Sequence, residues 1–212
     1  MVRSTEPVDL RLDVQSPADV TSGGGAWPFQ VDQIHDTAWF DDVFTDLELE
    51  AIIALGEQMG VERASVFGGD IRGVRDSHVR FMYPNEHTQW IYQRLTGSVV
   101  EANRQYFGFD LSGFEQGLQF TRYVAPHEHY EWHVDRGYGI GIRKLSLSLQ
   151  LSDPDSYEGG DLEVGTDREP QRVLRKRGRI TFFPSWAQHR VTPVTSGVRY
   201  SLVGWIGGPA FR

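Results

Sequence analysis

From Gly117 onward, short apolar or alternating runs follow one another, separated by glycine, proline, aspartate and serine. Runs of this length with no helical pattern between them are typical of a β sandwich or a jelly-roll barrel. The pattern therefore predicts a mainly β fold. We expect its strands at Leu118–Val124, Tyr130–Asp135, Arg143–Ser152, Asp161–Val164, Gln171–Leu174, Arg179–Phe183, His189–Val194 and Val198–Trp205.

Two amphipathic helices are predicted ahead of these strands. Thr45 and Glu48 have the spacing of a capping box, and the helix that they begin should end near Gly60. Asn85 can cap a second helix, which runs to about Tyr106. The first apolar stripe consists of Leu47, Ile52, Ile53 and Leu55. The second consists of Trp90, Ile91, Leu95, Val99 and Ala102.

The run Arg143–Ser152 has leucine at every odd position from 145 to 151 and a polar residue at every even position from 144 to 152. An antiparallel strand with one face on water would show this pattern, and so would a barrel strand with a polar pocket on its inner side. The second arrangement is favoured because both helices need an apolar surface to pack on. Ser148 and Gln150 are then expected to face the pocket.

Before the strands, the chain also contains two segments without regular periodicity. Residues 1–28 are polar and glycine-containing, which predicts a flexible N-terminal arm followed by a single domain at 29–212. Residues 64–80 combine glycines with Arg72 and Arg75 and lead into a predicted strand at His78–Tyr83. Such a loop can close over a site, although a plain surface loop has the same composition.

Composition excludes several classes of protein. The chain has 212 residues, a length that suits one domain with a full core. It has no cysteine, so disulfides, thiolate zinc sites and a cysteine nucleophile are excluded. The net charge of −8 argues against a nucleic-acid partner. No apolar run approaches ~20 residues and no signal-like segment begins the chain, so we expect no membrane contact and a cytoplasmic location.

The candidate chemistry begins at His133 and Asp135. Residues two apart on an extended segment point to the same face, so these two side chains can share a metal ion. His189, beyond the turn that follows Phe183, adds a second imidazole. Two imidazoles and one carboxylate make the facial triad of non-haem Fe(II) oxygenases.

Arg199 lies on the predicted strand that follows His189. An arginine that points into a barrel needs an anionic partner, and a carboxylate matches its two-pronged geometry. A cosubstrate that chelates the metal at one end and carries a carboxylate at the other would meet both requirements. 2-Oxoglutarate has that shape.

Five segments, in this order, resemble the iron- and 2-oxoglutarate-dependent dioxygenases of the prolyl 4-hydroxylase type, and most closely the bacterial and phage hydroxylases of that group. They are His133–Asp135, Tyr157–Leu162, Phe183–Ser185, His189–Val194 and Gly197–Tyr200. The resemblance covers about residues 117–208, which would be the catalytic core. It implies a double-stranded β-helix (jelly-roll) core supported by the two N-terminal helices.

The resemblance also implies the ligands and the reaction. Fe(II) would be held by His133, Asp135 and His189, and 2-oxoglutarate would be bound by Arg199 with help from Tyr123. The implied reaction hydroxylates an unactivated C–H bond of an amino acid, a peptidyl residue or a small metabolite. It consumes O2 and releases succinate and CO2, and ascorbate is a possible supporting reductant.

Other residues are expected around this centre. Ser148 and Gln150 would line the cosubstrate pocket. Arg136 and Tyr138 belong to a glycine-rich stretch at 136–142, placed to touch substrate at the pocket mouth, as Arg72 and Arg75 could from the earlier loop. We read Gly159-Gly160 as a hairpin turn. The substrate and the oligomeric state are left open by the sequence.

Two alternatives remain at this stage. If the strand that holds His133 began earlier, His127 and His129 would share its face, as in a cupin-like metalloenzyme or a zinc hydrolase. Pro126 favours a turn there instead, which places both histidines at the rim. The second alternative is a non-catalytic binding module on the same fold. Nucleic-acid demethylation is disfavoured because no second arginine follows Arg199 within Tyr200–Gly207.

Overall fold

The computed structural model describes residues 34–64, 73–136, 142–165 and 170–210, all within one compact unit, Ile34–Arg212. The predicted arm at 1–28 lies outside the described residues, as do Arg72 and Tyr138. No helix in the described part of the chain is both long and apolar enough to cross a bilayer.

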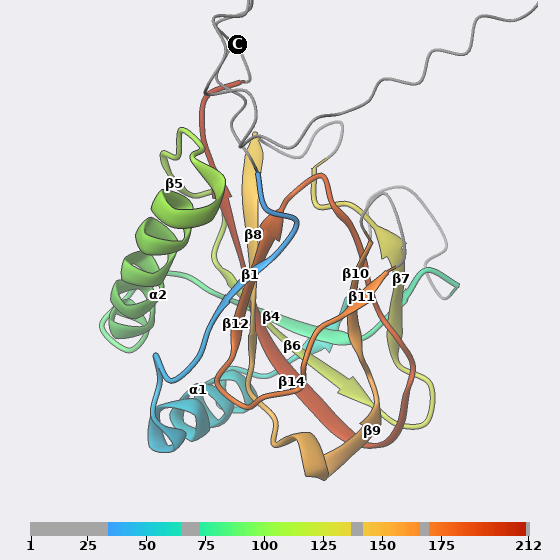
Figure 1. Ribbon diagram of the computed structural model, residues 1–212. Helices are drawn as coiled ribbons and strands as arrows, with labels where there is room; N and C mark the ends of the chain where they lie inside the picture. Colours follow the sequence, from blue (N-terminus) through green and yellow to red (C-terminus); the bar gives the residue numbers. More distant parts are fainter. Residues whose placement is uncertain (1–33, 65–72, 137–141, 166–169, 211–212) are drawn as a thin grey trace, which may run out of the picture. The chain divides into compact units, whose positions relative to one another are not determined.

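The described strands form two antiparallel sheets (Figure 1). The larger has nine strands. Seven follow the order β1 (Ala38–Phe40), β12 (Ile180–Pro184), β8 (Arg143–Gln150), β14 (Val194–Gly207), β6 (Leu118–Val124), β4 (His78–Met82) and β2 (Glu62–Arg63), and β14 also pairs with β5 (Gly113–Phe114) and β9 (Tyr157–Gly159). The smaller has the order β11 (Gln171–Arg172), β10 (Leu162–Gly165), β13 (Gln188–Val191), β7 (His129–His133) and β3 (Arg75–Asp76).

All eight predicted strands of the β-rich region are present, with ends that differ by up to four residues. The largest shift is in β14, which begins at Val194 because its first residues pair with β9. The glycine pair is not a hairpin turn, which corrects the expectation. β9 pairs with β14 in the larger sheet whereas β10 belongs to the smaller one, so Gly159 and Gly160 carry the chain from one sheet to the other. Both have positive φ angles, of 70° and 62°.

Helix α1 (Asp46–Gln58) begins with the predicted capping box. The Thr45 N–H donates to Glu48 Oε2 (2.8 Å), and the Glu48 N–H donates to Thr45 Oγ1 (3.3 Å). The predicted stripe is wrong at Leu47, which is 83% exposed. Five residues turn a helix by about 140°, so Leu47 cannot share a narrow face with Ile52. The buried positions are Leu49, Ile52 and Gly56.

Helix α2 (Gln89–Ala102) begins after Thr88, not at Asn85. The Asn85 side chain instead accepts hydrogen bonds from the His87 and Thr88 N–H groups, which closes the turn before the helix. The helix continues as a π-helical turn, η2 (Asn103–Phe107), and stops at Gly108, whose φ is 65°. Its predicted apolar residues are buried at Ile91, Leu95, Val99 and Ala102.

One apolar cluster joins both helices to the nine-stranded sheet. The odd-numbered leucines of β8 belong to this cluster. So do Phe182 of β12 and Leu202 of β14, on the strands beside β8 in the sheet, and Phe120 of β6, the strand beyond β14. Figure 1 shows the helices and the five-stranded sheet on opposite sides of the larger sheet. Because strand side chains alternate, the even-numbered residues of β8 face the space between the sheets.

Candidate metal centre and active-site pocket

A cavity of about 450 Å³ lies between the two sheets. The larger sheet supplies its floor from alternate residues of paired strands, such as Tyr123 of β6 opposite Arg199 of β14. The smaller sheet supplies the facing wall, which includes His133, Leu162 and His189. Six of the ten cavity-lining residues of the larger sheet are polar, namely Gln119, Tyr123, Arg143, Ser148, Arg199 and Ser201.

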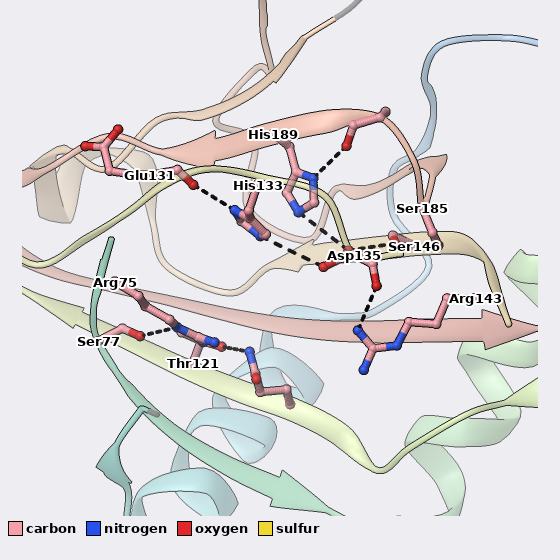
Figure 2. A network of polar contacts seen from close by, with 12 residues as sticks. Arg75, Ser77, Thr121, Glu131, His133, Asp135, Arg143, Ser146, Ser185 and His189 are labelled. Atoms are coloured by element: carbon pink, nitrogen blue, oxygen red, sulfur yellow. Dashed lines mark hydrogen bonds and ion pairs between the residues drawn. The ribbon is translucent and has the colours of Figure 1, made fainter. Parts of the chain in front are cut away.

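Three side chains converge at one end of this cavity (Figure 2). His133 ends β7 and is paired directly with His189 on β13, so their rings lie 4.1 Å apart. Asp135 follows two residues after His133, beyond the end of the strand. Its carboxylate oxygens lie 3.9 Å from His133 Nε2 and 3.5 Å from His189 Nε2. Among the described residues, these three form the one group with metal-ligand potential.

Backbone contacts fix the orientation of both imidazoles. His133 Nδ1 lies 2.8 Å from the Glu131 carbonyl oxygen, and His189 Nδ1 lies 3.0 Å from that of Ala187. A carbonyl oxygen can only accept, so each Nδ1 carries the proton and each Nε2 is left with a free lone pair. Both free nitrogens face Asp135, as metal binding requires.

Asp135 is held by contacts from β8 and from the turn that follows β12. The Ser146 hydroxyl donates to Asp135 Oδ2 (2.7 Å) and lies 2.9 Å from the Ser185 hydroxyl. The N–H groups of Asp135 and Arg136 both donate to the Ser185 carbonyl oxygen at 3.0 Å. These contacts fix the carboxylate although it lies in a loop.

Burial sets the protonation states of this group. Burial and the adjacent His189 lower the pKa of His133 to about 3. For Asp135, burial acts to raise the pKa, but His189, His133 and the Ser146 hydrogen bond together hold it below the ordinary value. At neutral pH the His133 imidazole is therefore neutral and the carboxylate is charged, which is the state that coordinates a divalent cation.

The donor set fits a metal ion. Two ligand atoms about 2.1 Å from one ion can lie at most ~4.2 Å apart, and both histidine–aspartate separations satisfy this limit. Two imidazoles and one carboxylate suit Fe(II) and leave coordination positions free for further ligands.

Arg199 is buried at the cavity with only 3% of its surface exposed. Its Nη1 donates weakly to Ser201 Oγ (3.3 Å), and its guanidinium lies 5.6 Å from the centre of the Tyr123 ring. Its Nε is buried without a hydrogen-bond partner, and no carboxylate of the described residues forms an ion pair with it. A buried guanidinium in this state can accommodate an anion.

The remaining predicted site residues occupy different places. Ser148 lines the cavity, whereas Gln150 lies in a small adjoining hollow and donates to Tyr157 Oη (2.8 Å). Arg75 lines the cavity from β3. Arg136 follows Asp135 and is half-buried, outside the set of cavity-lining residues.

The two histidines of the cupin-like alternative are not part of the metal-ligand group. His127 is exposed in a turn, as expected. His129 was expected in the same turn, but it begins β7, which corrects that expectation; its Nδ1 lies 2.8 Å from the His127 carbonyl oxygen.

Sequence reasoning missed three residues that support the site. Ser146 shares the alternation of Ser148, so its inward direction was available from the sequence. Tyr130 stacks on the His133 ring at 3.5 Å, and the Arg143 guanidinium lies 4.1 Å over the Trp205 ring while Nη1 reaches the Asp135 carbonyl oxygen (3.3 Å). The contact of Arg143 with Trp205 joins distant parts of the chain, so no local pattern signals it, whereas Tyr130 and His133 lie only three residues apart.

Comparison with known proteins gives consistent results. Residues 118–207 match the family described as the 2OG-Fe(II) oxygenase superfamily. A PKHD-type hydroxylase of Synechococcus sp. (strain CC9311) is 46% identical over 78 residues, 36% of each chain. PKHD-type hydroxylase YbiX of Shigella dysenteriae is 33% identical over 159 residues, 71% of this chain and 70% of that one. The chain spans only 36% to 41% of the length of three PKHD-type hydroxylases that it matches, the Synechococcus protein among them.

Solved structures show the same jelly-roll fold. A Pseudomonas putida prolyl-4-hydroxylase superposes with a TM-score of 0.66 at 20% identity, over 83% of this chain and 94% of that one. A Trichoplax adhaerens prolyl hydroxylase, solved with a hypoxia inducible factor peptide, superposes with a TM-score of 0.68 at 15% identity, over 81% and 83%. The chain therefore belongs to the 2OG-Fe(II) oxygenase superfamily, and within it to the prolyl 4-hydroxylase type.

Proposed function

We propose that this protein is an Fe(II)- and 2-oxoglutarate-dependent dioxygenase that hydroxylates an unactivated C–H bond, with 29–212 as its catalytic domain. The observation that carries the proposal is the placement of two features in one cavity: the His133–Asp135–His189 group and Arg199, which has no anionic partner among the described residues. A metal-ligand set and an anion-binding arginine in one cavity suit a cosubstrate with a chelating end and a carboxylate end.

Each residue has a defined task in this proposal. His133, Asp135 and His189 hold Fe(II), and Ser146 and Ser185 keep the aspartate in place. Arg199 binds the far carboxylate of 2-oxoglutarate, with the Tyr123 hydroxyl and Ser148 beside it. When bound, iron and 2-oxoglutarate supply the oxidising chemistry with O2 and release succinate and CO2.

The walls of the cavity orient the reactants and exclude water. Burial raises the pKa of the Tyr123 phenol, so the phenol stays protonated and can donate a hydrogen bond to an anion. Apolar residues such as Phe183 and Val191 shield the reacting end. The proposed reaction needs no general acid or base from the protein, because the bound cofactor carries it.

The substrate is proposed as an amino acid, a peptidyl residue or a small metabolite. The prolyl hydroxylases among the similar structures, one of them solved with a peptide, support the peptidyl option. Arg75 and Arg136 are proposed to contact substrate, as are Arg72 and Tyr138 in segments outside the described residues. The proposal places the enzyme in the cytoplasm, with ascorbate as a supporting reductant and no nucleic-acid partner.

The test is a titration of 2-oxoglutarate into anaerobic Fe(II)-loaded protein, followed by the visible metal-to-ligand charge-transfer band. We expect a saturable band in the parent and none in His189→Ala. Arg199→Ala should need about 30-fold more 2-oxoglutarate, because losing one partner of a buried charge pair costs about 2 kcal/mol or more.

His127→Ala and His129→Ala are matched controls, since each removes an imidazole outside the ligand group. Both should keep the band of the parent. A folded, iron-loaded parent without a band would overturn the proposal, and loss of iron in the two control variants would point to the cupin-like site instead. Succinate release then provides the screen for substrates.

A further inference from the structure

Arg75, proposed above only in general terms to contact substrate, is a second buried arginine in the cavity. It is 9% exposed and lies on β3, paired with Tyr130 of β7. Its guanidinium lies 4.5 Å over the Tyr130 ring, and that ring stacks on His133. Figure 2 shows Arg75 beside Ser77, below His133 in the view. The arginine is thus held one aromatic ring away from a proposed iron ligand.

The hydrogen-bonding capacity of Arg75 is only partly used. Its Nε donates to Ser77 Oγ (2.9 Å), whereas its Nη2 is buried without a partner. The neighbouring carboxylate of Asp76 is bound to Arg63 (2.8 Å) and does not neutralise Arg75. A buried guanidinium donor without an acceptor is costly, so this arrangement is explained best by a ligand.

The charges around the cavity point to the sign of that ligand. Among the described lining residues, three are cationic and two are anionic: Arg75, Arg143, Arg199, Asp135 and Glu115. A divalent cation and the 2-oxoglutarate dianion add no net charge. The loaded cavity therefore keeps one excess positive charge.

That excess charge can be assigned to Arg75. Arg143 contacts Gln116 (2.7 Å) and the Asp135 carbonyl oxygen, and both Asp135 and Glu115 act to raise its pKa against the effect of burial. Arg199 is taken by the cosubstrate carboxylate. Arg75 alone among the three has neither a nearby anion in the described chain nor an assigned one.

We propose that Arg75 binds an anionic group of the substrate, a carboxylate in particular, and thereby selects acidic over neutral molecules. This inference rests on the proposed function, because it takes the cosubstrate as the partner of Arg199. The carboxylate is either a chain end, as in a free amino acid or a peptide terminus, or an acidic side chain. In both cases its oxygens accept from Nη2, and the target C–H bond lies towards His133 and His189.

The test uses protein loaded with Fe(II) and 2-oxoglutarate without oxygen, and measures dissociation constants by calorimetry. One probe pair is N-acetyl-L-proline and its amide, for a terminal carboxylate. The other is the α-amide of N-acetyl-L-aspartate and the corresponding asparagine compound, for a side-chain carboxylate. At least one carboxylate should bind about tenfold or more tightly than its amide, as expected of a charge-assisted bond in a cavity.

Arg75→Gln should remove most of this preference, and Arg75→Lys should retain part of it because the charge remains. Arg80→Gln is the matched control, since it removes one positive charge from β4, outside the cavity lining. It should leave the preference unchanged. Unfolding curves establish that each variant is folded.

Three results would overturn the inference. One is equal binding of carboxylate and amide by the parent, and another is no saturable binding of either carboxylate. The third is an Arg75→Gln variant that needs about tenfold more 2-oxoglutarate to develop the charge-transfer band, which would assign Arg75 to the cosubstrate. A missing band with an intact carboxylate preference would instead reject the proposed function and leave the anion subsite standing.

Discussion

At the scale of single residues, Ser146 is the side chain that holds the aspartate ligand from the larger sheet. Its hydroxyl contacts both Asp135 Oδ2 and the Ser185 hydroxyl, so one residue connects the loop that carries the ligand to β8 and to the turn after β12. Groups that orient metal ligands commonly affect metal affinity about 10- to 100-fold.

Ser146→Ala should therefore weaken Fe(II) binding by about 10- to 100-fold, because the carboxylate loses the contact that orients it. Competition against a chelator of known affinity measures this loss. Ser148→Ala is the matched control, since Ser148 is the next inward-facing serine of β8 and does not touch Asp135 in any described contact. Equal iron affinity in Ser146→Ala and the parent would show that the backbone contacts to Ser185 suffice.

The sequence predicted the metal-ligand group but only part of its support. His133, Asp135 and His189 could be found because their residue types and order carry the chemistry. The inward direction of Ser146 follows from the alternation of β8. Its bond to Asp135 depends on where the chain turns after β7, and no residue pattern encodes that turn.

At the scale of elements, the contact between α1 and β6 is made possible by a glycine. A methyl group added at Gly56 would lie 2.5 Å from the Phe120 ring, which is fully buried. By contrast, nothing lies within 4 Å of the position that a methyl group would occupy at Gly97 of α2. A glycine-to-alanine substitution therefore meets a packed side chain in α1 and open space in α2.

Gly97→Ala should stabilise the fold by about 1 kcal/mol, the difference in helix propensity. Gly56→Ala gains the same propensity but forces the Phe120 ring to move, and overpacking of this kind costs about 1–3 kcal/mol. We therefore expect Gly56→Ala to be neutral or destabilising by up to about 2 kcal/mol. Urea unfolding of both variants measures the difference, and equal stabilisation would mean that α1 packs more loosely.

Elements with a clear period were predicted well, and most of the short strands outside the periodic region were not. The strands from β6 to β14 that showed apolar or alternating runs were all found. Strands β1, β2, β3, β5 and β9 have two or three residues each, too few to show a period of two. They exist because a longer partner strand presents free backbone groups, which is a property of the fold and not of the local sequence.

At the scale of the whole molecule, the metal-ligand group ties the two sheets together. His133 and His189 belong to the smaller sheet, while Asp135 is hydrogen-bonded to Ser146 of the larger one. A metal bound by all three side chains is present only in the folded state, so binding adds to the free energy of unfolding.

Free Fe(II) at about 100 times its dissociation constant should stabilise the parent by about 2.7 kcal/mol. For a chain of this size that gain raises the melting temperature by about 5–10 °C in anaerobic scans. His189→Ala should lose most of the shift. Arg199→Ala should keep the shift from iron and lose the further increase on adding 2-oxoglutarate. A similar iron-dependent shift in His189→Ala would place the ion elsewhere.

The general architecture could be predicted because two amphipathic helices and one leucine-rich strand each have an apolar face that is buried by packing against the others. The division of strands between two sheets could not be predicted from periodicity alone. It depends on long-range pairing, such as that of β9 with β14 and of β3 with β7. The contact of Arg75 with Tyr130, on which the proposed anion subsite depends, arises from that last pairing and was therefore visible only in the structure.

The position of β14 has a consequence for the synthesis of the protein. This strand is the last one described in the chain, yet it lies between β8 and β6 in the middle of the larger sheet. A nascent chain that has not reached residue 207 cannot join those two neighbours, and sheets with such distant pairings fold slowly. Arg199, which is proposed to bind 2-oxoglutarate, can thus join the His133–Asp135–His189 group only after β14 has been synthesised.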